Sequence, residues 1–132
     1  TEYERRRPAD DPEWVYWLTE DEIIVMAGRC YVELGQPDRA IPLLTGVLAC
    51  YDERQTRESA LYTSWLAEAH VQAGDIEHAA ALAQRTLELS SSTSSARGDD
   101  RITLLAQRLG PYHRVSAARE FLDHEAEWRR GG

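Results

Sequence analysis

Four histidines are the side chains of this sequence best suited to holding a metal ion. His70 and His78 are eight positions apart, and Gly74 between them is expected to break a helix, so the two should not share a helical face. His113 and His124 fall on different expected elements, and the HEAEW run from His124 only begins like the HExxH zinc motif. The spacing therefore predicts no metal site, and we expect His70 to be a packing residue.

The sequence also lacks the motifs of nucleophilic catalysis and nucleotide binding. The serines gather between Ser90 and Ser95, without a GxSxG elbow around any of them. The chain contains neither a P-loop sequence nor a GxGxxG sequence. We therefore expect no enzyme activity, no catalytic residues and no cofactor.

The composition narrows the possible partners. The 132 residues suit a single domain, and a net charge of −8 with a pI near 5.0 argues against a nucleic-acid surface. No apolar run reaches the roughly 18 residues that a membrane helix needs. All 15 basic residues are arginine, and the chain contains neither Lys nor Asn. Because both missing residues use A-rich codons, this usage indicates a high-GC, bacterial genome. Because the first residue is Thr, we expect a fragment of a longer protein.

Two cysteines, Cys30 and Cys50, each lie in an apolar stretch and do not form a CxxC pair. The favoured interpretation is two buried free thiols in a reducing, cytoplasmic compartment, and a disulfide between them stays open as an alternative.

Residues 35–48 (GQPDRAIPLLTGVL) and 74–87 (GDIEHAAALAQRTL) repeat one pattern 39 positions apart. In each copy the leading glycine is expected to end one helix, and Pro37 or Asp75 suits the start of the next. Apolar residues then recur at spacings of three and four, as on one face of a helix. A third, degenerate copy follows after another 39 positions, with His113 in place of the glycine.

A partner helix is expected before each of these turns. Small residues recur at one position of the first helix and again twelve residues later, at Gly28, Ala67 and Ala106 and at Ala40, Ala79 and Ala118. Small residues in both places let two antiparallel helices pack closely. We therefore predict an all-α fold of antiparallel helix hairpins at about 20–50, 56–90 and 99–128.

This pattern resembles the tetratricopeptide repeat (TPR), in which a Leu-Gly-x-x-Tyr segment precedes an Ala-x-x-x-Phe segment with a period of about 34. The matching positions are Ala27-Gly28-x-x-Tyr31, Ala40-x-x-x-Leu44, Leu66-Ala67, Ala79 and Ala118-x-x-x-Leu122. The chain lacks the first large aromatic and the closing proline of that signature. The resemblance covers about 19–125 and implies a TPR-like domain at 19–130, with hairpins stacked as a short right-handed superhelix.

The segment before this domain, residues 1–18, is interpreted as a linker and an apolar lid. PEWVYWL (12–18) places three aromatic residues close together, which is typical either of a binding motif or of a lid over the end of a solenoid; we favour the lid. Thr19 to Glu22 form a capping-box sequence that predicts a helix start near Glu20.

A second resemblance is to the C-terminal repeat regions of actinobacterial helix-turn-helix regulators of the XRE type. It rests on WVYWLTEDEI, AGRC, ALYTSWLAEA, AGD and SAR, which occur in this order. It implies a cytoplasmic sensor or oligomerisation module, with DNA contacted by a domain outside this chain.

In the TPR family the first helix of each hairpin lines a concave groove for a peptide or another helix. Carried over by position, the groove residues here are Val25, Arg29, Val32, Trp65, Glu68, Gln72 and Gln107. Arg29 would bind a ligand carboxylate and Trp65 would supply an apolar anchor. The alternatives are that Arg29 pairs with Glu68 across adjacent helices and that Trp65 belongs to the core. Members of the family that bind the C-terminal carboxylate of a chaperone use a two-carboxylate clamp built from Lys, Asn and Arg. Because this chain has no Lys and no Asn, that clamp cannot be built here in its usual form.

The expected function is accordingly a non-catalytic protein- or peptide-binding or oligomerisation module, the regulatory domain of a bacterial transcription regulator. The alternative is a stand-alone TPR scaffold or adaptor without a DNA-binding domain. The expected partners are a protein or peptide, or a second copy in a homodimer, with no membrane and no direct nucleic-acid contact by this chain.

Overall fold

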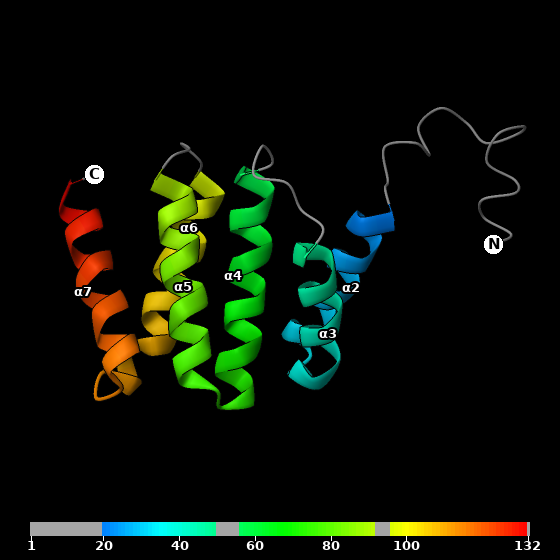
Figure 1. The fold of residues 1–132 in the computed structure, drawn as a ribbon, viewed down its shortest axis with the longest axis horizontal. Helices are drawn as coiled ribbons and strands as arrows, with labels where there is room; N and C mark the ends of the chain where they lie inside the picture. Colours follow the sequence, from blue (N-terminus) through cyan, green and yellow to red (C-terminus); the bar gives the residue numbers. More distant parts are fainter. Residues whose placement is uncertain (1–19, 50–55, 92–95, 132) are drawn as a thin grey trace, which may run out of the picture.

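The computed structural model describes residues 20–49, 56–91 and 96–131, and throughout them the chain forms helices and turns without a strand (Figure 1). The elements are α2 (Glu20–Glu33), α3 (Pro37–Ala49), α4 (Thr56–Ala73), α5 (Ile76–Ser91), α6 (Ala96–Leu109), the 3-10 turn η3 (Gly110–Tyr112) and α7 (Ser116–Gly131). The expected all-α class is confirmed for these residues. Each of the described helices is too short or too polar to cross a membrane.

The first two hairpin turns are built in the same way. Gly35 has φ 70° and Gly74 has φ 85°, a left-handed conformation that suits glycine because it has no Cβ. Two backbone hydrogen bonds form a Schellman motif at each glycine. The glycine N–H donates to the carbonyl three residues earlier, at 3.0 Å in both turns. The N–H of the following residue donates to the carbonyl five residues before it. The expectation that these glycines end helices is confirmed.

The third turn uses different chemistry, as the missing glycine predicts. Helix α6 continues into η3, where Pro111 follows Gly110, and His113 keeps a right-handed φ of −63°. The chain then turns through a backbone bond from Val115 N–H to the carbonyl of Tyr112 at 2.9 Å. No left-handed residue is needed at this position, so a histidine is tolerated there.

The helices pack in a row that runs from α2 and α3 to α7 (Figure 1). The first helices of the hairpins contact one another, α2 with α4 and α4 with α6, and α5 contacts α7. Helix α4 lies centrally, against α2, α3, α5 and α6, and residues 62–70 are buried without interruption. A helix that is buried on all sides must find partners for each polar side chain it carries.

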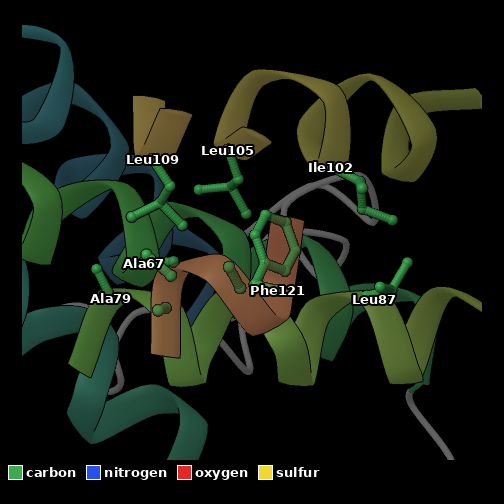
Figure 2. Close-up of a cluster of buried hydrophobic side chains, with 10 residues drawn as sticks. Ala67, Ala79, Leu87, Ile102, Leu105, Leu109 and Phe121 are labelled. Atoms are coloured by element: carbon green, nitrogen blue, oxygen red, sulfur yellow. The ribbon is translucent and has the colours of Figure 1, made fainter. Parts of the chain in front are cut away.

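Two apolar clusters share α4. The first core lies between α2, α3 and α4 and consists of Val25, Val32, Ala40, Leu44, Val47, Tyr62, Trp65, Leu66 and Ala69. The second core joins α4 to α7 and consists of Ala67, Ala79, Ala80, Ala83, Leu87, Ile102, Leu105, Leu109, Ala118 and Phe121. Figure 2 shows Phe121 facing Leu105, with Ile102 and Leu109 on either side. Burial of this phenylalanine contributes about 1.5–3 kcal/mol.

Helices α2 and α3 approach closely at Gly28, which is buried. A Cβ added there would lie 2.8 Å from Cγ of Leu44, itself fully buried. Ala67, one repeat later, carries its Cβ within the second core. Small residues at both positions are therefore buried, and at Gly28 the packing leaves no room for a Cβ.

Several expectations lie outside the described residues. These include the linker and lid at 1–18, the capping residue Thr19, and Cys50. Cys30 corrects the expectation of a buried thiol, because it is a free and exposed cysteine of α2. Proximity to apolar residues in sequence does not bury a side chain, because burial depends on which face of the helix packs against a neighbour.

Candidate binding groove

A buried ion pair lies where α4 faces α6. Nη2 of Arg101 donates to Oε1 of Glu68 at 2.7 Å, with side chains only 12% and 9% exposed. The same guanidinium donates to Ser64, from Nε to the hydroxyl oxygen at 2.9 Å and from Nη2 to the carbonyl at 3.3 Å. These bonds offset the desolvation of two charges that are held away from water.

Ser64 shows why this cluster is structural rather than nucleophilic. Its hydroxyl donates to the carbonyl of Leu61 at 2.6 Å while it accepts from Arg101. No general base contacts the hydroxyl in these interactions, and a guanidinium cannot remove its proton. The serine holds the arginine in place.

Trp65 extends the cluster towards α2. The guanidinium carbon of Arg101 lies 3.8 Å from the Trp65 ring centroid, and that of Arg29 lies 4.8 Å away. Cation–π contacts of this kind contribute about 0.5–2 kcal/mol each. The indole is thus a buried member of the first core that also positions two cations.

A pocket of about 400 Å³ opens next to the ion pair, between the C-terminal halves of α4 and α6. Its lining is Glu68, Val71, Gln72, Gln107, Arg108, Pro111 and Tyr112. Nη2 of Arg108 is 4.0 Å from Oε2 of Glu68, and the Arg108 side chain is 55% exposed. Glu68 and Arg108 are the charged residues of this lining, and Arg101 lies behind Glu68, so the two guanidinium groups (+2) and the carboxylate (−1) together carry +1 beside the pocket, in a chain whose net charge is −8.

Gln72 and Gln107 border the pocket from α4 and α6. Nε2 of Gln72 donates to the carbonyl of Val32 at 2.8 Å, which ties the end of α2 to α4. Gln107 is exposed. The structure therefore brings Glu68, Gln72 and Gln107 together at one pocket, as their assignment to a common groove requires.

The other predicted groove residues lie elsewhere. Val25, Val32 and Trp65 are buried in the first core, so the expectation that they face a ligand is corrected. Helices α2 and α4 contact each other directly, and their inward side chains fill the space that a wider superhelix would leave open. The alternative that Trp65 is a core residue is therefore the better one.

Arg29 does not pair with Glu68. Its Nε lies 3.4 Å from Oε1 of Glu33, one turn along α2, and both side chains are about half exposed. Glu68 is taken by Arg101, which sequence reasoning missed. A signal existed: Glu68 is the only charged residue of 60–69 (ALYTSWLAEA), and a carboxylate buried in such a segment requires a cation from a neighbouring helix.

Two histidines also lie where the sequence reasoning did not expect them. The rings of His70 and His78 are 4.0 Å apart between centroids, and Asp75 contacts both. As expected, they do not share a helical face, since His70 lies on α4 and His78 on α5, but the antiparallel return from α4 to α5 brings the end of one helix beside the start of the next. Burial lowers the pKa of His70 below its ordinary value of 6.5, and the nearby His78 lowers it further, whereas Asp75 acts in the opposite direction.

A shallower pocket of about 360 Å³ lies between α5 and α7. His124 Nδ1 is 2.9 Å from Oε1 of Gln84 across it, and Phe121 forms part of its wall. Two of its three charged residues, Arg85 and Glu88, pair with each other at 4.0 Å, and the third is Glu120.

Comparison of the chain with protein-family models, with curated protein sequences and with solved structures gives no match in any of the three.

Proposed function

We propose that this chain is a non-catalytic binding module that takes a peptide or protein segment at the pocket between α4 and α6. The observation that carries the proposal is the uncompensated charge at that pocket. Arg101 already pairs with Glu68 at 2.7 Å, so Arg108, which is exposed and lies 4.0 Å from the same carboxylate, can exchange this long contact for a carboxylate of a ligand. Tyr112 and Pro111 beside it offer an apolar surface for a neighbouring side chain.

The stacking of hairpins supports a TPR-like superhelix as the scaffold of this site. First helices contact first helices along the row, and the two glycine turns recur in the same register. In this proposal α2 and α4 close against each other, so binding is confined to the α4–α6 end of the inner face.

For the wider role we propose the regulatory domain of a bacterial, cytoplasmic transcription regulator. Ligand binding between α4 and α6 would favour one packing of these helices over another and so reposition an attached DNA-binding domain. The alternative is a stand-alone scaffold. Reading the native gene upstream of the Thr1 codon separates the two: a helix-turn-helix pattern supports the regulator, and further hairpins alone support the scaffold.

The binding proposal is tested by panning a random-peptide display library on the full chain. We expect enriched peptides to carry Asp or Glu next to an apolar residue, and to bind Arg108→Glu at least about tenfold more weakly, a loss of about 1.4 kcal/mol.

The matched control is Arg85→Glu on α5. Arg85 is also 55% exposed and also lies 4.0 Å from one glutamate, but it borders the other pocket. Peptides that bind both variants equally, or a library that yields no enriched acidic sequences, would contradict the proposal. Sedimentation equilibrium of the same samples tests whether the occupant is instead a second copy of the chain.

A further inference from the structure

Three potential metal ligands converge at the turn between α4 and α5, at the lower end of these helices in Figure 1. Nδ1 of His70 lies 3.6 Å from Oδ2 of Asp75, and Nδ1 of His78 lies 3.5 Å from the same oxygen. The donor atoms of the three residues all lie within 4.8 Å of one another.

The backbone of this turn fixes the arrangement. The N–H of Asp75 donates to the carbonyl of His70 at 3.0 Å, as the second bond of the Schellman motif after Gly74. The carbonyl of Asp75 then accepts from Ala79 N–H at 3.0 Å, so Asp75 sits at the start of α5 with His78 three residues later on the same face. The three side chains are therefore placed by one rigid turn rather than by a long loop.

The distances suit a small, tetrahedrally coordinated ion. With Zn–N and Zn–O bonds of about 2.0–2.2 Å, neighbouring ligand atoms of a tetrahedron are separated by about 3.3–3.6 Å. The two Nδ1–Oδ2 separations fall at the upper end of that range. Two imidazoles and a carboxylate favour Zn²⁺ or another divalent transition metal over Mg²⁺ or Ca²⁺, which prefer all-oxygen sites.

His70 supplies an independent observation. Its side chain is only 9% exposed, and its Nδ1 has no hydrogen-bond partner, since 3.6 Å to Asp75 is too long for one. A buried nitrogen without a partner costs free energy, and a bound cation would satisfy it.

We propose that His70, Asp75 and His78 bind one divalent transition-metal ion of the Zn²⁺ class at the α4–α5 turn. Asp75 and His78 are each 53% exposed, so the ion has access from solvent. A fourth position is left for water or a partner's side chain. The ion joins the last turn of the central helix to the first turn of α5, and so restrains the hairpin that carries the proposed peptide site.

The test is Zn²⁺ calorimetry and Co²⁺ absorption spectroscopy on the full chain carrying Cys30→Ser and Cys50→Ser, because thiols would bind the same ions. We expect one equivalent of metal, tetrahedral Co²⁺ bands, and a melting temperature raised on the order of 5–10 °C at metal about 100-fold above Kd.

Variants at the exposed ligands keep the test independent of folding. His78→Gln and Asp75→Asn should each weaken Zn²⁺ binding at least about tenfold. His124→Gln is the matched control, since His124 is an exposed histidine on α7 with its own glutamine partner. Unchanged affinity in His78→Gln, equal losses in His124→Gln, or no saturable binding would each overturn the proposal. In the last case the three residues serve only to close the turn.

Discussion

The two faces of α4 are held in different ways. Against α2 the interface is mainly apolar, with Val25, Val32 and Trp65 in the first core. Arg29 over the Trp65 ring and one hydrogen bond from Gln72 add to it. Against α6 the interface includes the buried Glu68–Arg101 pair and opens into a pocket. The same inward positions of a repeated hairpin thus serve mainly packing on one side and an ion pair on the other, because the cation that neutralises the buried carboxylate comes from α6.

The largest expected effect comes from breaking the polar side. Glu68→Ala leaves Arg101 buried without its carboxylate, and we expect a loss of about 3–5 kcal/mol in the free energy of unfolding, measured by urea denaturation. Glu33→Ala, which removes the exposed partner of Arg29, should cost less than about 1 kcal/mol. Similar losses in the two variants would show that the α6 side does not depend on its ion pair.

Gly28→Ala tests the tight packing on the apolar side. The new Cβ would lie 2.8 Å from Cγ of the fully buried Leu44, and we expect a loss of about 1–3 kcal/mol from overpacking. Gly46→Ala in α3 is the control: nothing lies near its added Cβ, so helix propensity should raise stability by about 0.5–1 kcal/mol. Equal shifts of the melting temperature would argue against a close approach at Gly28.

The two glycine turns should respond alike to substitution. Gly35→Ala and Gly74→Ala each place a Cβ in a left-handed conformation, with an expected cost of about 1–2 kcal/mol by chemical denaturation. Gly110→Ala, which has no left-handed φ, should cost less. If only Gly74→Ala lowers the free energy of unfolding, the turn after α4 depends on side-chain contacts as well as on its backbone conformation. The contacts among His70, Asp75 and His78 would account for that result.

The smallest effect expected is the pH dependence that His70, at the α4–α5 turn, gives to the free energy of unfolding. Because the pKa of His70 is lowered in the folded state, the unfolded chain binds the proton more readily below pH 6.5. Stability contributed by the neutral ring is therefore present above pH 6.5 and is lost as the pH falls through the folded-state pKa. Comparing the unfolding free energies of the metal-free protein and of its His70→Leu variant across this pH range isolates the effect, and an identical pH dependence in the two proteins would contradict it.

Much of the helical framework was predictable because it depends on local features. Glycines that end helices, a proline that begins one, and apolar residues three and four apart act within a few residues of one another. These features act over one helix and its turn, so they can be read from a single sequence.

The site depended on neighbours in space. Position in a repeat assigned Val25, Val32 and Trp65 to a groove, but burial is decided by how closely α2 approaches α4. Arg101 is 33 residues from Glu68, and His70 and His78 meet only because the chain reverses at Gly74.

The sequence by itself therefore determined the all-helical class, the repeat and its glycine turns, through interactions that act over one helical turn. The tertiary structure decided which inward residues are covered, which charges pair and which histidines converge. Those outcomes depend on how closely the helices pack against one another. Neither residue type nor spacing along the chain specifies the distance between two helices.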